Sequence, residues 1–140
     1  GCFEGNASGP AIARIARDRW TGEGPLADLA GGDPQNITSR MVFDAADDGD
    51  KTANEVVDLT IENVAIGLGS LLNVFNPEAL VIGGGVVQGL QRHWDRLQES
   101  VIDHSLPGYG GTIPLTATRL GDDVSLLGAA QLAFRQARRQ

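Results

Sequence analysis

Residues 76–86 constrain the fold most, because a short apolar run in this stretch is followed at once by three glycines. The run from Ala79 to Ile82 predicts a short strand that is buried on both faces, as in a parallel sheet. Gly83, Gly84 and Gly85 come next, and an amphipathic segment begins just after them. A strand that turns into a helix through glycines gathers bare backbone amides at a helix N-terminus, which suits a phosphate or nucleotide. A tight turn with nothing bound explains the glycines equally well.

Composition sets outer limits on the protein class. A length of 140 residues with 41% hydrophobic residues predicts one domain, or a large part of one, with a real core. The net charge of -7 argues against a nucleic-acid surface. The sequence has neither a long apolar run nor a signal peptide, and its single cysteine cannot form an internal disulfide. We therefore expect a soluble cytoplasmic protein with no membrane partner.

The start of the chain indicates that residues are missing before it. The sequence begins Gly1-Cys2, and its one methionine is Met41. We therefore expect either a fragment of a longer protein or a processed N-terminus.

Helical spacing predicts helices on both sides of the central strand. A first helix runs from about residue 10 to residue 20, with Ser8 as its N-cap and with Arg14 and Arg17 in solvent. A Gly- and Pro-rich connection over residues 21–36 follows, and then a short helix to about residue 46. After the glycines, one helix is expected to continue to about residue 105. A final helix begins after Asp122 or Asp123 and ends near residue 139.

The longest predicted helix spans residues 53–75. Asp50 or Thr52 is its expected N-cap, with Thr52 and Glu55 spaced as a capping box. Its second half is apolar almost all round, which predicts that it is buried on every side. Gly67 and Gly69 weaken a helix by about 1 kcal/mol each relative to alanine. We interpret them as places of close contact, with simple packing favoured over a ligand.

The last third of the chain completes the predicted fold. Residues 113–119 alternate between apolar and polar, which predicts a second strand parallel to the first. The fold class is therefore α/β, with a buried parallel βαβ unit and long packing helices. The small residues Gly128-Ala129-Ala130 predict close packing of the last helix against the sheet or a nucleotide.

Three other patterns indicate alternative sites, and each departs from its template. A calcium loop starting at Asp44 has Ala46 at its third position, which offers no side-chain oxygen. A phosphate turn over residues 48–52 follows a predicted helix instead of a strand. A dinucleotide fingerprint starting at Gly83 would have its third glycine, Gly89, one place late. The histidines at 93 and 104 have no metal-ligand spacing and are interpreted as surface residues.

Several motifs in a fixed order resemble one known family. These motifs are Gly1-Cys2-x-Glu4 with Ser8-Gly9, then Asn76-Pro77-Glu78 before Ile82-Gly-Gly-Gly-Val86, and finally Leu120-Gly-Asp-Asp123 before Gly128-Ala-Ala130. Together they resemble the C-terminal half of the ROK family of repressors, open reading frames and sugar kinases. The resemblance covers essentially the whole chain and implies the C-terminal lobe of a two-lobed, actin-like ATPase (ribonuclease H-like) fold, here incomplete.

The resemblance implies roles for particular residues. Cys2 matches the last of three cysteines that hold a structural zinc together with a histidine. Glu4 matches an acid that hydrogen-bonds the sugar hydroxyls, and the glycines at 83–85 match the nucleotide-side turn. The resemblance also implies ATP with Mg²⁺, a hexose substrate and a homodimer, with an open sheet edge that is either paired in the dimer or poorly ordered.

Parts of the family pattern are absent from these 140 residues. The other zinc ligands are missing, so the chain alone is not expected to hold zinc. The Asp-x-Gly-x-Thr phosphate turn and the Asn-Asp pair with the catalytic base are also missing, so no catalytic residue is assigned and the chain alone is expected to be inactive. Two alternatives stay open: the effector lobe of a sugar-responsive repressor, and a degenerate fragment kept for structure or dimerisation.

Overall fold

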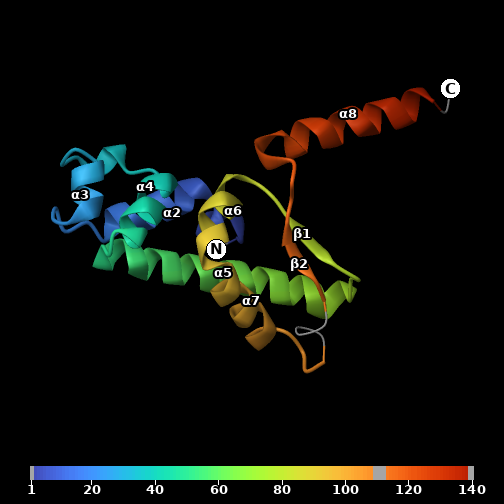
Figure 1. The fold of residues 1–140 in the computed structure, drawn as a ribbon, viewed down its shortest axis with the longest axis horizontal. Coiled ribbons are helices and arrows are strands. Elements are labelled where there is room, and N and C mark those ends of the chain that lie inside the picture. The colour runs from blue at the N-terminus through green and yellow to red at the C-terminus, as the bar shows by residue number, and fades with distance from the viewer. Residues whose placement is uncertain (1, 109–112, 139–140) are drawn as a thin grey trace.

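The structure is a computed structural model that describes residues 2–108 and 113–138, apart from the side chain of Asp122. Figure 1 shows mostly helices and one pair of strands. In order the elements are α1 (Glu4–Ala7), α2 (Gly9–Asp18), α3 (Pro25–Leu29), the 3-10 turn η1 (Pro34–Asn36), α4 (Ser39–Asp47), α5 (Lys51–Phe75), β1 (Leu80–Ile82), α6 (Gly85–Leu90), η2 (Gln91–His93), α7 (Trp94–Asp103), β2 (Leu115–Ala117), η3 (Gly121–Asp123) and α8 (Val124–Ala137).

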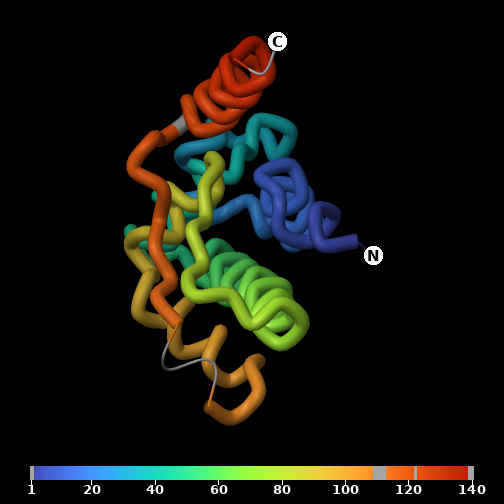
Figure 2. The backbone as a smooth tube through the Cα atoms, turned by 90° about the vertical axis from the view of Figure 1, so that its right-hand side faces the viewer, coloured from blue at the N-terminus to red at the C-terminus, as the bar shows by residue number. Residues whose placement is uncertain are grey.

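Helix α5 is the centre of the arrangement. In Figures 1 and 2, α2 to α4 gather over its first part, α7 lies along the opposite side, and the strands cross near its end. The core combines side chains from all of these elements, including Ile12, Leu26, Val42, Val56, Leu72, Leu97 and Leu115. Within the described residues, no helix is both long enough and apolar enough to cross a bilayer.

Strands β1 and β2 form the predicted parallel pair. Leu80 lies opposite Leu115 and Ile82 opposite Ala117, and α6 and α7 connect the two strands. The prediction of burial on both faces is wrong, because Val81 is 67% exposed. Leu80 and Ile82 pack on the helical core, whereas the face that carries Val81 is left in solvent. A single helical layer covers the sheet.

The long helix ends where the sequence predicted, but it begins two residues earlier. Asn76 adopts a left-handed conformation (φ 42°) after Phe75, and Pro77 follows. At the other end, the carboxylate of Asp50 accepts from Ala53 N at 2.9 Å and from Leu26 N at 3.0 Å. Asp50 is therefore the N-cap. The alternative capping box at Thr52 is wrong, because the buried carboxylate of Asp50 already takes the free amide.

The second half of α5 is buried on one stripe and not all round. Val64, Ala65, Leu68, Gly69 and Leu72 are buried. Apolar side chains on the other side are exposed; they are Ile66, Leu71, Val74 and Phe75. The all-round prediction is wrong because α7 covers only one side of this part of α5.

Both glycines of α5 make the close contacts that the sequence predicted. A Cβ added to Gly69 would lie 2.6 Å from the carbonyl oxygen of His104, and one added to Gly67 would meet the ring of Phe3. Asn73 fixes the same crossing, since its side-chain amide donates to His104 O at 3.2 Å and accepts from Leu106 N at 2.8 Å. The contact of α5 with the end of α7 is thus a backbone contact.

Four further predictions are corrected. The helix expected over residues 86–105 is broken into α6, η2 and α7. Asp123 makes no side-chain cap bond to α8. A Cβ on Gly128 would meet nothing within 4 Å, so the small residues of α8 do not pack on the sheet. Arg17 is partly buried and donates to the carbonyls of Pro34 and Ile37 at 3.1 and 2.8 Å, because the connection after α3 folds back over α2.

Replacing Gly69 with alanine tests the α5–α7 contact. The new methyl group would clash with the carbonyl of His104, and overpacking of this kind costs about 1–3 kcal/mol. We expect the midpoint of urea unfolding to fall. Gly128→Ala is the matched control, since its methyl group is free and should raise the helix content. Equal stability of Gly69→Ala and the unchanged chain would contradict the contact.

Replacing Asp50 with alanine tests the start of α5. The variant loses an N-cap and leaves the amide of Leu26 without its buried partner, which together cost about 2–4 kcal/mol. We expect Thr52→Ala to change the unfolding free energy by less than about 0.5 kcal/mol. Chemical denaturation of both variants measures the difference, and a large loss in Thr52→Ala alone would restore the capping box.

Candidate functional site

The three positions after β1 are occupied by glycine for different structural reasons. A Cβ on Gly83 would lie 2.8 Å from Cγ2 of Thr118, which follows β2. Gly84 adopts φ 116°, a conformation that side chains disfavour. Gly85 begins α6, has no such φ, and would place a Cβ in open space. Packing and backbone conformation therefore explain Gly83 and Gly84 but not Gly85.

Gly85 lies at the edge of a groove between α4 and α6. The groove has a volume of about 200 Å³ and is lined by Ser39, Arg40, Phe43, Asp44, Gly85, Gln88, Gly89 and Arg92. Typical ligand pockets hold about 300–1,000 Å³, so the groove is large enough for part of a ligand. A smaller hollow of about 30 Å³ lies behind the turn, where Gly84 meets Thr118 and Gly121. The segment at Gly121 thus lies beside the glycine turn.

Close packing of an aromatic ring on a glycine sets the width of the groove. Phe43 is a buried residue of α4, and its ring occupies the space that a Cβ on Gly89 would need. The ring also lies 6.3 Å from the ring of His93 at a tilt of 32°. Phe43 therefore sits between α6 and η2, and the position of α6 depends on this contact.

Arg40, Asp44 and Arg92 line one side of the groove, and Asp47 pairs with Arg92 beside it. Arg92 pairs with Asp47 and also with Asp44, at 3.2 Å from the latter. Hydrogen bonding to Asp47 raises the pKa of Arg92 further above its already high ordinary value. Arg40 is almost fully exposed and lies 3.7 Å from Asp44, so this pair contributes little to stability. Both arginines line the groove, and both are paired with Asp44 there.

His93 differs from the surface histidine that the sequence indicated. Its side chain is only 13% exposed, and its Nε2 is buried without a hydrogen-bond partner among the described residues. The nearest carboxylate oxygen is Oδ1 of Asp47, at 3.9 Å, beyond hydrogen-bond range. Burial lowers the pKa of His93 below its ordinary value of 6.5, and the charge of Asp47 opposes this only in part. His93 is therefore neutral at neutral pH.

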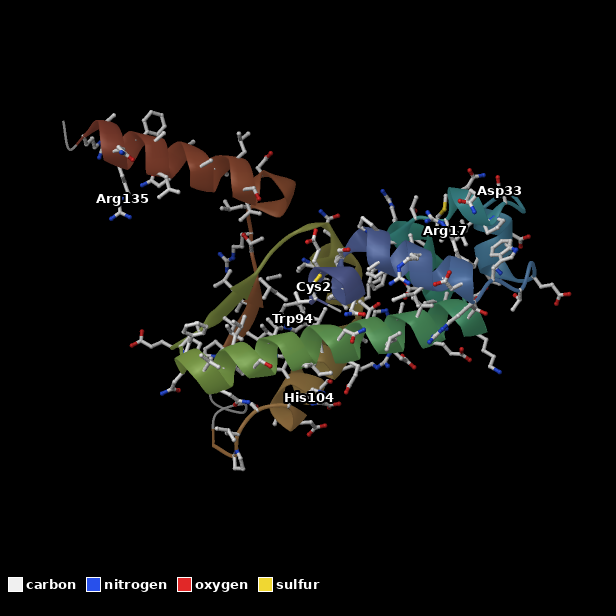
Figure 3. The ribbon with its side chains drawn as sticks, turned by 180° about the vertical axis from the view of Figure 1, so that it is seen from behind. Cys2, Arg17, Asp33, Trp94, His104 and Arg135 are labelled. Carbon is white, nitrogen blue, oxygen red and sulfur yellow. The ribbon has the colours of Figure 1, made fainter. Side chains whose placement is uncertain are left out.

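The other two predicted site residues lie on a different part of the molecule. Cys2 is an exposed free thiol just before α1, and Glu4 is exposed in the first turn of α1. Figure 2 places α1 on the opposite side of the molecule from the strands, and Figure 3 labels Cys2 on the opposite side of α5 from His104. The structure therefore does not bring Glu4 into the groove at Gly85.

The described residues do not assemble a metal centre. They contain no group of three or more His, Cys, Asp or Glu side chains placed to hold an ion. The residues considered for a calcium loop belong to other structures: Asp44 is in α4, Glu55 is in α5, and Asp50 caps α5. One exposed thiol does not fit a four-ligand zinc site, so this chain alone does not match the zinc that the family resemblance implied.

Sequence reasoning found the glycine turn but missed the opposite wall of the groove. Phe43, Asp44 and Arg92 were not identified, because they become neighbours of the turn only through contacts between α4 and α6. Gly89 was noticed only as a misplaced fingerprint residue. A glycine inside a predicted helix was the available signal of a close aromatic neighbour.

The sequence and fold both place the chain in one family. Residues 1–136 match the family model described as ROK family. The chain therefore belongs to the ROK family. Over the part that it matches, it has the fold of ROK sugar kinases, which is of the actin-like ATPase type.

Three relatives illustrate the family. The chain is 32% identical to a glucokinase of Thermotoga maritima over 133 residues, which cover 94% of this chain and 42% of that protein. It superposes with a TM-score of 0.83 and 31% identity on a ROK family glucokinase of Streptomyces griseus, crystallised with glucose and AMPPNP. That match covers 94% of this chain and 44% of the other. It is also 25% identical to the DNA-binding transcriptional repressor Mlc of Escherichia coli, over 93% of this chain and 31% of the repressor. The chain thus spans less than half the length of these relatives.

The buried position of His93 predicts a pH dependence of stability. Because burial lowers its pKa in the folded state, the unfolded state binds the proton more tightly. The free energy of unfolding should therefore fall as the pH drops below about 6.5, and should level off below the folded-state pKa. Urea unfolding at several pH values measures this loss, and His93→Gln should remove most of it. The control variant His104→Gln should retain the fall in unfolding free energy at low pH. An unchanged fall in His93→Gln would contradict its assignment to His93.

Proposed function

We propose that this chain is the C-terminal lobe of an ATP-dependent sugar kinase of the ROK family. The intact protein would transfer the γ-phosphoryl group of ATP to a hydroxyl of a hexose such as glucose. Family membership supports the sugar-kinase class, as does the similarity to glucokinases over nearly the whole chain. The share of each relative that the chain spans, 42% and 44%, supports the proposal of a single lobe.

The glycine turn is the proposed nucleotide-binding element. Gly85 carries this part of the proposal, because neither packing nor backbone conformation requires a glycine there, and it borders the groove. Gly83 and Gly84 shape the turn, and all three glycines are exposed. Backbone that is free of side chains permits the close approach of a ribose or phosphate. Arg40 and Arg92 line the same groove, where Asp44 balances part of their charge.

Glu4 is the proposed sugar-binding residue. Its exposed carboxylate can accept hydrogen bonds from two hydroxyl groups, as an ionised carboxylate does in many sugar sites.

We propose that the chain alone is catalytically inactive. Phosphoryl transfer needs a base for the attacking hydroxyl and a metal-bound triphosphate in the correct position. The Asn-Asp pair and the phosphate turn of the family do not occur in these 140 residues. In the intact enzyme, Mg²⁺ would enter with ATP as part of the substrate, and Cys2 would supply one ligand to a zinc completed by other residues. We also propose a cytoplasmic homodimer.

The effector lobe of a sugar-responsive repressor is the second candidate. The similarity to the repressor Mlc over 93% of the chain favours it. Sequencing the coding region upstream of Gly1 separates the two candidates. An Asp-x-Gly-x-Thr turn and an Asn-Asp pair there would indicate the kinase, and a helix-turn-helix would indicate the repressor.

Replacing Gly85 with valine tests the nucleotide site. A Cβ at this position meets no protein atom within 4 Å and the residue lines the groove, so we expect stability to change by less than about 1 kcal/mol. Binding of AMPPNP, measured by isothermal titration calorimetry, should weaken by about tenfold or more, since the new side chain occupies ligand space.

Gly128→Val is the matched control for Gly85→Val, because a Cβ at that position also meets nothing within 4 Å and lies in α8. The control should bind AMPPNP as the unchanged chain does. Equal binding by Gly85→Val and the control would place the nucleotide elsewhere. No binding of AMPPNP by the unchanged chain would count against the nucleotide role of this lobe.

A further inference from the structure

His93 belongs to the contact that holds α6 against α4, although it lies outside the groove itself. The ring of Phe43 lies between Gly89 of α6 and the imidazole of His93 in η2. Asp47 of α4 pairs with Arg92 through Oδ2, while its Oδ1 faces Nε2 of His93. One aspartate thus lies beside two consecutive residues of η2, the segment that directly continues the helix begun by the glycine turn.

Charged groups from three α-helices and from η2 itself surround His93. Asp47 comes from α4 and Asp58 from α5, and both favour a proton on the imidazole. Arg96 of α7 and Arg92 of η2 oppose the proton, as does burial, which is the largest effect. With His93 neutral, its Nε2 has no partner among the described residues, and Asp47 is bonded to Arg92 alone.

A proton on His93 changes what this contact requires. A buried imidazolium needs a hydrogen-bonded counter-charge, and Oδ1 of Asp47 is the nearest carboxylate oxygen, at 3.9 Å. A charge-assisted hydrogen bond of about 2.8 Å requires the two groups to move together by about 1 Å. Gly89 lies four residues before His93 and packs on the Phe43 ring between them, so this ring links a movement of His93 to the position of α6.

We propose that His93 is a positioning residue for the glycine turn. Protonation of His93 shifts α6 from its packed position against Phe43 of α4 and so alters the groove between the two helices. When His93 is neutral, Asp47 pairs with Arg92, and Gly89 of α6 stays packed against the ring of Phe43. When His93 is protonated, it bonds to Asp47 and weakens the pair between Asp47 and Arg92. The groove wall formed by Gly85 and Gly89 then changes its position. The coupling itself is a property of this chain; its effect on ATP rests on the proposed function.

Nuclear magnetic resonance of the full chain tests the coupling without any ligand. The pH is lowered from about 8 to about 5, the range in which histidines titrate. We expect the backbone amide signals of Gly85 and Gly89 to shift with the same midpoint as the imidazole signal of His93. In His93→Gln these amide shifts should disappear. In the control His104→Gln, which alters the far end of α7, they should persist.

Asp47→Asn provides a second variant in case His93→Gln does not fold. It keeps the size of the side chain but removes the charge that attracts the protonated imidazole, so the amide shifts of both glycines should shrink. Amide signals that stay constant while His93 titrates would overturn the proposal. So would glycine shifts that persist unchanged in whichever variant folds.

Binding of AMPPNP adds the functional test. Affinity should fall by about fivefold from neutral pH to below the midpoint of His93, at the low end of couplings between sites. The fall should be absent in His93→Gln. If the glycine amides titrate with His93 but AMPPNP binds at no pH, the nucleotide function fails and the coupling stands. If AMPPNP binds with the same affinity across the range, the role of His93 in positioning the binding turn is wrong.

Discussion

The close approach of α7 to α5 is the constraint on which the rest of the structure depends. The carbonyl of His104 lies against Gly69, and the amide side chain of Asn73 ties down the backbone on both sides of it. This contact fixes the direction of α7, and with it the path of the chain from the glycine turn to β2. At its other end, α5 is fixed by Asp50, which joins its first turn to α3. The groove lies between α4 and α6, which the contacts at the two ends of α5 hold in place.

Local sequence signals predicted the elements well, and tertiary contacts decided the rest. The strand at Leu80, the glycine turn, the parallel partner at Leu115 and the end of α5 at Asn76 were predicted, because each is set by residues near it in the chain. Burial of Val81 and of the whole second half of α5 was wrong, since an apolar run shows that a segment tolerates burial but not which faces are covered.

The candidate site divides in the same way. The turn at Gly83–Gly85 was visible in the sequence, whereas its opposite wall was not. Phe43 and Gly89 are 46 positions apart in the chain, and only the packing of α4 on α6 brings them together. His93 was taken for a surface residue because no local pattern reveals that Phe43 and Asp47 cover it. Two glycines of α6 carry information about the site. Gly89 marks the close approach of the Phe43 ring, and Gly85 borders open space beside the groove.

The exposed apolar face of α8 has a consequence for how molecules of this chain behave toward each other. Leu126, Leu132 and Phe134 lie in solvent on a helix that stands away from the body in Figure 1. The net charge of -7 gives separate molecules a mutual repulsion at neutral pH. Salt shortens the range of that repulsion to about 8 Å at physiological ionic strength, and acidification toward the isoelectric point near 4.6 removes it. The exposed apolar side chains of α8 attract other molecules at short range. The isolated chain therefore depends on long-range charge repulsion to stay dispersed in solution.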